Sequence, residues 1–368
     1  MSEAVNKTAP AVGAEQVALL ERLCNAAGVS GDEREVRAII LEQVKGLADE
    51  VRVDSLGSVL AVKHARVENP LRVMLDAHMD EVGFMIVSDE ESGLYRFVKV
   101  GGIDDRSLPG KPVLVGKDNI PGVIGAKPIH LTEPGETANK ISVDSLRIDV
   151  GPGGGRIRPG DRAVFATRFR EVGPSFIAKA LDNRLGCVTL IEILRAADQL
   201  PEHIELLLSW SVQEEIGLRG ARTAAYSLNP DLAIAVDATP AYDLPAFDEG
   251  EDGALENARY NTRLGYGPAI YLADSHTLGD PRIARHIMKT GDELGIPYQV
   301  RQPGGGGTDA GAIHLARAGV PVLSISTPGR YMHTAASLVR RSDWENTLRL
   351  VWNGLLRMER GIVQSERR

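Results

Sequence analysis

Two adjacent glutamates, Glu214 and Glu215, directly follow an apolar stretch, "IELLLSWSV" (204–212), that is typical of a buried strand. A Glu-Glu pair in this position is most often part of a solvated loop. Here, however, other side chains that can bind metals or move protons also lie at or just beyond the ends of predicted strands. They are His78 and Asp80 after "RVMLDA", Asp237 at the end of "LAIAVD", and His333 after "LSISTPGRYM".

Asp182 adds a carboxylate at the start of the predicted helix in "KALDNRLGC". Each of these residues alone has an ordinary explanation, such as a core histidine, a helix N-cap or a surface loop. Together they place two histidines and several carboxylates at the strand ends of one sheet, where α/β proteins bind their ligands. This is the ligand set of a site for two divalent ions about 3.5–4 Å apart, which can activate a water between them. Asp80, two residues beyond His78, is placed to orient its imidazole.

Strand and helix patterns alternate at both ends of the chain. Between residues 15 and 83, two helical patterns, the second with Ser30 as its N-cap, precede a hairpin and a buried strand. After residue 174 the alternation resumes, with helices predicted at 280–295 and 311–319. Between residues 87 and 173, short β-like segments are separated by Gly, Pro and Asp turns, which is typical of a small barrel or sandwich.

These patterns predict an α/β fold with two domains. The catalytic domain comprises residues 1–86 and 174–368 and contains a mixed sheet flanked by helices. Residues 87–173 form an inserted all-β, barrel-like domain, and none of the candidate ligands lies within it.

The glycine run "GGGGTDAG" (304–311) has two interpretations. Glycine amides before a helix can bind phosphate, but the lysine of a P-loop is missing. We therefore expect the backbone to pass close to a substrate, and we assign Gly306, Gly307 and Asp309 to substrate binding. Asp309 could act there as a helix cap or as a supporting acid.

Several motifs resemble those of one peptidase family. "LDAHMDEVGFMI", "ALDNRLGC", "VQEEIGLRGA", "AVDATPA", "GGGTDAGAIHLARAGVPV" and "PGRYMHT" are similar to the successive motifs of the tetrahedral aminopeptidases. This family of dinuclear metallopeptidases includes the glutamyl aminopeptidases, and some members were once named endoglucanases. The resemblance covers the chain from about Val17 onward. It implies a zinc-peptidase-like catalytic domain whose inserted β domain drives dimerisation.

The resemblance also implies a role for each candidate residue. Asp182 would bridge two metal ions, His78 and Asp237 would complete one site, and Glu215 and His333 would complete the other. Glu214 would be the general base that holds the proton of a water bridging the two ions. Adjacent side chains on a strand point to opposite faces, so the strand must end by Gln213 for both glutamates to reach the site.

The predicted function is thus a metal-dependent aminopeptidase acting on peptides with a free N-terminus. Zinc or cobalt is expected, and manganese also suits these ligands. The alternatives are a related dinuclear amide hydrolase (a carboxypeptidase or deacylase) and a catalytically inactive shell protein. A glycosidase fits less well, because its paired carboxylates need no histidines. The resemblance further implies dimers that assemble into dodecamers.

Bulk properties exclude other classes of function. The 368-residue chain has a formal net charge of −8 and no basic stripe, which argues against nucleic-acid binding. No apolar run approaches the ~20 residues that span a bilayer, so no membrane partner is expected. The two cysteines, Cys24 and Cys187, do not suggest a disulfide framework, and the cytoplasm is the expected compartment.

Overall fold

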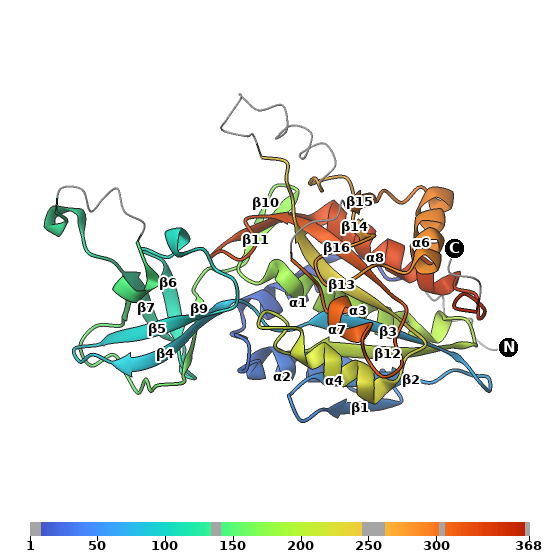
Figure 1. The fold of residues 1–368 in the computed structure, drawn as a ribbon, viewed down its shortest axis with the longest axis horizontal. Coiled ribbons are helices and arrows are strands. Elements are labelled where there is room, and N and C mark those ends of the chain that lie inside the picture. Colours follow the sequence, from blue (N-terminus) through green and yellow to red (C-terminus); the bar gives the residue numbers. More distant parts are fainter. Residues whose placement is uncertain (1–8, 134–140, 245–261, 302–305, 365–368) are drawn as a thin grey trace.

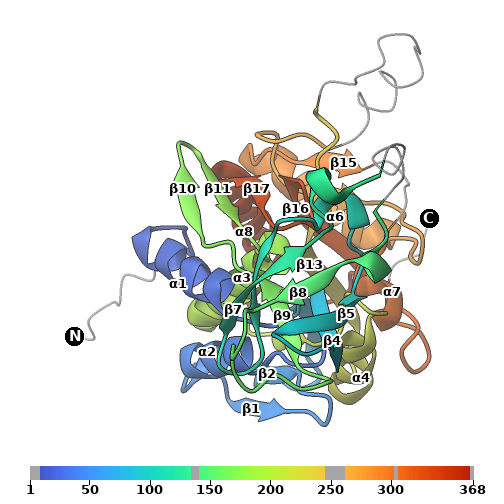
Figure 2. The ribbon, with the colours of Figure 1, turned by 90° about the vertical axis from the view of Figure 1, so that its left-hand side faces the viewer.

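The computed structural model describes residues 9–133, 141–244, 262–301 and 306–364. A small β barrel projects from a larger α/β body (Figure 1). Seen from the barrel side, the barrel strands lie in front of the α/β body (Figure 2). The predicted α/β fold, with a mixed sheet flanked by helices and an inserted β domain, is confirmed.

The α/β body is built on one mixed sheet. Its strands run in the order β1 (Glu50–Val53), β2 (Val59–Lys63), β12 (Ile204–Ser211), β3 (Leu71–His78), β13 (Leu232–Pro240), β16 (Val322–Arg330), β17 (Ser337–Arg340), β11 (Ser175–Ala178) and β10 (Arg170–Val172). Two short strands, β14 (Ala269–Tyr271) and β15 (Gln299–Arg301), extend from β16. The central strands β12, β3, β13 and β16 are parallel, so their carboxyl ends meet at one edge.

Helices bury both faces of this sheet because its central strands are apolar on both sides. In β12, Leu206 and Leu208 join one core while Leu207 joins the opposite one, as the two-residue period of a strand requires. The first core is covered by α1 (Ala14–Asn25), α2 (Arg34–Val44), α3 (Leu181–Ala196), α6 (Pro281–Leu294) and α8 (Arg341–Leu356). The second is covered by α4 (Arg219–Leu228) and α7 (Ala310–Ile313).

The inserted domain is a closed barrel. Its strands are β4 (Gly83–Asp89), β5 (Leu94–Val100), β8 (Arg147–Asp149), β7 (Ile120–Gly125), β6 (Pro112–Val115) and β9 (Arg162–Phe165), in that order. The core contains Phe84, whose ring meets those of Phe97 and Phe165 edge-on at 5.2 and 5.1 Å. The barrel begins at Gly83 and its last strand ends at Phe165, whereas the predicted insert spans 87–173. The strand β10 lies within the predicted insert but pairs with β11 in the main sheet.

Two local predictions are wrong. Ser30 is not an N-cap, because α2 begins at Arg34 after Glu33, and the Ser30 hydroxyl instead donates to Asp80. The helix predicted at 311–319 is only the short α7. The helix predicted at 280–295 is confirmed as α6, with Asp280 as its N-cap. Among the described helices, none is long and apolar enough to cross a membrane.

Candidate active site

The predicted metal and proton-transfer residues gather at the carboxyl edge of the parallel strands. His78 ends β3, the glutamate pair follows β12, and Asp237 lies within β13. Asp182 lies at the start of α3, and the turn between β16 and β17 carries His333. All of them line one cavity of about 610 Å³: His78, Asp182, Glu214, Glu215, Asp237 and His333.

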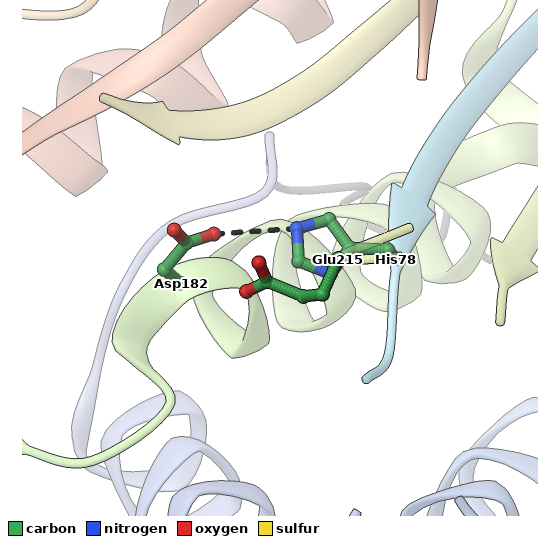
Figure 3. Close-up of side chains that lie close together, drawn as sticks. All are labelled: His78, Asp182 and Glu215. Carbon is green, nitrogen blue, oxygen red and sulfur yellow. Dashed lines mark ion pairs between the residues drawn. The ribbon is translucent and has the colours of Figure 1, made fainter. Parts of the chain in front are cut away.

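Asp182 lies between the two histidines. Its Oδ1 is 3.2 Å from His78 Nε2, and its Oδ2 is 3.4 Å from His333 Nε2 (Figure 3 draws the first pair). The backbone of Asp182 and Asn183 is not helical, although it lies within the bounds of α3. The Asn183 amide donates to the carbonyl of Val236 at 2.8 Å, which ties this start of α3 to β13. Each carboxylate oxygen of Asp182 therefore faces a different imidazole.

The remaining carboxylates divide between the same two histidines. His78 Nε2 is 3.4 Å from Asp237 Oδ1, and His333 Nε2 is 3.4 Å from Glu215 Oε2. His78, Asp182 and Glu215 each offer one ligand atom, and these atoms lie within 4.8 Å of one another (Figure 3). The arrangement is therefore two histidine–carboxylate pairs on either side of a shared aspartate.

Asp80 holds the glutamate pair. Its Oδ1 accepts the backbone N–H of Glu214 at 3.0 Å, and its Oδ2 accepts that of Glu215 at 3.2 Å. The Ser30 hydroxyl donates to the same Oδ2 at 2.6 Å. Asp80 also lies beside His78, with 3.5 Å between Oδ1 and Nδ1. Its predicted place beside the imidazole is thus accompanied by a second task, which is to fix the turn carrying both glutamates.

The turn after β12 brings the two glutamates into the cavity. The strand ends at Ser211, and Gln213 adopts a left-handed backbone conformation with φ of 58°. This break in the strand removes the alternation that would have sent Glu214 and Glu215 to opposite faces. The strand end expected from the sequence is therefore present.

The barrel contributes to the site through a backbone carbonyl. His333 Nδ1 donates to the carbonyl oxygen of Gly102, in the turn after β5, at 2.9 Å. Because Nδ1 donates in this contact, Nε2 is the ring atom that faces Asp182 and Glu215, and it would offer its lone pair to a cation when the ring is neutral. The insert supplies none of the six side chains, but it fixes the orientation of one of them.

The clustered charges shift the pKa values of the site. Burial opposes ionisation of Asp182, but the hydrogen bonds of His333 and His78 lower its pKa below the usual range. Burial also lowers the pKa of His333, yet Asp182 and Glu215 outweigh it and raise that pKa to about 10. Burial raises the pKa of Glu215 to about 8 and that of Glu214 well above its ordinary value. Such crowding of acids favours bound cations.

The glycine run divides between two positions. Gly306 and Gly307 line the cavity, where a peptide backbone can approach theirs. Asp309 does not: it is 2% exposed, lies outside the cavity lining, and its Oδ2 accepts the Ser211 hydroxyl at 2.7 Å. Nor does its side chain cap α7. Asp309 therefore lies at the sheet edge behind the cavity, a position that suits the predicted supporting acid and not the predicted helix cap, and its part in substrate binding stays a prediction. Residues 304 and 305 lie outside the described residues.

Three further polar side chains line the cavity and were not predicted from the sequence: Tyr271, His276 and Arg301. Tyr271 ends β14, and the Arg301 guanidinium at the end of β15 lies 4.3 Å above its ring. The strands that carry them are only three residues long, too short for a clear period-two pattern. The polar turn "DSHT" after "AIYLA" was the one available signal for His276.

A parallel sheet edge lined with histidines and carboxylates is a candidate site for hydrolytic chemistry. The model of the M42 glutamyl aminopeptidase family matches residues 57–350, and the chain belongs to that family. The lysyl aminopeptidase of Pyrococcus furiosus is 33% identical over 345 residues, covering 90% of this chain and 94% of the relative. The glutamyl aminopeptidase of Lactococcus lactis is 33% identical over 330 residues, covering 86% and 88%.

Solved structures agree with this assignment. The TET aminopeptidase of a marine sediment thaumarchaeote superposes with a TM-score of 0.88 at 32% identity, over 96% of this chain and 99% of that one. The TET1 peptidase of Pyrococcus horikoshii, described as assembling into a tetrahedron or a large octahedral shell, gives 0.80 at 30% identity, over 93% and 100%. A Thermotoga maritima protein described as an endoglucanase gives 0.74 at 32% identity, over 94% and 97%.

Proposed function

We propose that this protein is a metal-dependent aminopeptidase that removes N-terminal residues from peptides. The observation that carries the proposal is the position of Asp182, whose two oxygens face two different histidines. A carboxylate with this arrangement suits a ligand shared by two ions. Membership of an aminopeptidase family supports peptides as the substrate class.

The donor set fits two divalent cations. His78 and Asp237 would hold one ion, Glu215 and His333 the other, and Asp182 both. Imidazole nitrogens and carboxylate oxygens suit zinc, cobalt or manganese, and the four carboxylates that line the cavity favour a bound cation. When bound, such ions lower the pKa of a shared water and polarise the carbonyl of the substrate.

Glu214 is the general base of the proposed mechanism. It lines the same cavity, and Asp80 holds its backbone at 3.0 Å, so the carboxylate is presented from a fixed turn. It takes a proton from the attacking water and passes it to the leaving amine, which makes the amine a neutral leaving group. Its raised pKa follows from burial and suits a group that must both accept and release a proton.

The test compares a tetrapeptide with its N-acetylated twin and with a soluble β-glucan. An aminopeptidase cleaves only the peptide with a free amino group and releases its first residue. Release of the last residue would indicate a carboxypeptidase, and cleavage of the acetyl group a deacylase. Glucan hydrolysis would favour the glycosidase, and no turnover with any substrate would indicate an inactive shell protein.

Metal content is measured on the same preparation. Two ions per chain are expected after metal loading, and Asp182→Ala should lose both because the shared ligand serves each. A single ion in the wild type, or one retained ion in the variant, would contradict the dinuclear proposal. The comparison of zinc, cobalt and manganese in the loading step identifies the metal that supports the highest kcat.

We also propose that the chain forms dimers that assemble into dodecamers, with the barrel as the dimerisation domain. The support is the described assembly of the Pyrococcus horikoshii relative and the exposed apolar side chains of the barrel: Val87, Val98 and Val123. Replacing the barrel by a short linker should give a smaller species by light scattering. A wild-type protein that is monomeric at micromolar concentration would contradict this proposal.

The cytoplasm remains the proposed compartment. Cys24 and Cys187 are both buried free thiols. An interior that keeps its cysteines reduced is typical of reducing compartments. Fractionation of cells that express the protein from its own promoter tests this proposal.

A further inference from the structure

A short loop between β14 and α6 presents His276 to the active-site cavity. The imidazole lines the same cavity as the six predicted residues. The loop is internally braced: Asp274 Oδ1 accepts the backbone N–H groups of His276 at 2.8 Å and Thr277 at 2.7 Å. Ala273 and Leu278 also form an isolated β-bridge across it. The loop therefore holds His276 in a defined position.

One hydroxyl fixes the protonation pattern of the ring. The Ser275 Oγ lies 2.5 Å from the carbonyl oxygen of Gly306 and 2.9 Å from His276 Nδ1. A carbonyl oxygen can only accept, so it takes the single hydroxyl proton of Ser275. The Ser275 oxygen must then accept from His276, which places a proton on Nδ1. In the neutral imidazole this leaves Nε2 as a hydrogen-bond acceptor.

The backbone of the glycine-rich segment also lies close to the ring. A Cβ atom added to Gly307 would lie 2.3 Å from His276 Nδ1 and 3.2 Å from its Cγ. A Cβ atom on Gly311 would lie 2.7 Å from the Cβ of His276. Glycine at both positions therefore lets the imidazole pack directly on this backbone, and the ring cannot rotate freely.

We propose that His276 is a substrate-binding residue whose Nε2 accepts a hydrogen bond from an N–H group of the bound peptide. This inference rests on the proposed peptidase function and adds a residue to it. Peptides offer such donors at the free α-ammonium group and at each backbone amide. A fixed acceptor on a braced loop binds them at low entropic cost, because neither the ring nor the loop must become ordered.

The first test separates the hydrogen bond from the packing. His276→Phe keeps a ring against Gly307 but has no acceptor, so kcat/KM should fall about 10-fold, mostly through KM. His276→Gln places an amide oxygen near the position of Nε2 and should recover part of the loss. Leu278→Ala is the matched control, since Leu278 belongs to the same loop, is 72% exposed and does not line the cavity. Metal content should be the same in all three.

A second test uses the contact with Gly307, whose backbone is not in the left-handed region. Gly307→Ala should displace the imidazole and lower kcat/KM about as much as His276→Phe. In a His276→Ala background the clash with the imidazole is gone, so Gly307→Ala should lower kcat/KM less than it does in the wild type, and only by what the added methyl group costs against the substrate backbone. Equal effects of Gly307→Ala in both backgrounds would overturn the proposal, and so would a His276→Phe enzyme with wild-type KM.

The source of the N–H is found by varying the substrate. An aminoacyl-nitroanilide carries only the α-ammonium and the scissile N–H, whereas a tetrapeptide adds further amides. A defect of His276→Phe with both substrates assigns the donor to the first residue or the scissile bond. A defect with the tetrapeptide alone assigns it to a later residue. If the wild type cleaves these substrates and His276→Phe cleaves them equally well, only this inference is overturned. If the wild type cleaves none of them, the proposed function is overturned as well.

Discussion

Asp80→Asn is the sharpest test of how the site is positioned. In the wild type, Oδ1 accepts the backbone N–H of Glu214, while Oδ2 accepts that of Glu215 and the hydroxyl of Ser30. An asparagine has one oxygen and one NH₂ group. Whichever way its amide is turned, the NH₂ group faces a backbone N–H of one glutamate. That N–H then has no acceptor, and the turn must move.

The expected losses of stability and activity follow from this one unpaired N–H group. A polar group that loses its partner in a partly buried place costs about 1–2 kcal/mol of stability. The neutral side chain also removes the charge beside His78 Nδ1. A shift of the turn by about 1 Å can lower the rate ~10²-fold, because it misplaces the general base Glu214. We therefore expect a small loss of stability and a fall in kcat of about 10²-fold.

The assay measures kcat, metal content and urea unfolding for Asp80→Asn beside Ser30→Ala. The latter removes one hydrogen bond to Asp80 and leaves both glutamate N–H groups paired, so its kcat should fall far less. Burial opposes ionisation of Asp80, but hydrogen bonds from His78, Ser30 and the backbone of Glu214 lower its pKa. The stability that this carboxylate contributes is therefore present above about pH 4 and is lost as the pH falls through its lowered pKa.

Wild-type kcat in Asp80→Asn would refute this account of the turn. An equal loss in Ser30→Ala would also refute it, because the glutamate N–H groups keep their acceptor there. The difference in unfolding free energy between wild type and Asp80→Asn should shrink below about pH 4.

Three further predictions address separate parts of the molecule. Glu214→Gln should keep both metals and lose about 10²–10⁴-fold in kcat, and added metal should not restore the activity. Glu215→Gln should lose a metal ligand and regain activity in excess metal, so a metal titration of kcat separates the two variants. Gly101 has φ of 88°, and a Cβ atom added to it would lie 2.7 Å from Val82, so Gly101→Ala should move the turn that holds His333 and weaken metal binding in a chelator competition. Gly110→Ala is the control, because Gly110 has a similar φ of 77° but no neighbouring atom within 4 Å of an added Cβ. Burial raises the pKa of Asp343 to about 6, so its contribution to stability is largest below about pH 4 and is lost as the pH rises through 6; Asp343→Asn should remove this pH dependence from urea unfolding curves.

The sequence alone determined which side chains stand at the ends of the central strands. His78, Asp237 and the glutamate pair follow apolar runs whose length and composition mark buried strands, and these patterns are local. Because parallel strands end at one edge of a sheet, local patterns were enough to predict that these residues meet. The barrel was predictable for the same reason, since closely spaced turns limit the lengths of its strands.

Only the tertiary structure decided how these side chains are held. Ser30 and Gly102 reach the site from segments far away in the chain, and their local patterns predict nothing more than a helix cap and a turn. Asp309 is buried and His276 faces the cavity, although both lie in glycine-rich or polar loops that look alike in sequence. These contacts depend on the order of strands in the sheet and on the docking of the barrel. Both are set by apolar packing between distant segments, which no short stretch of sequence encodes.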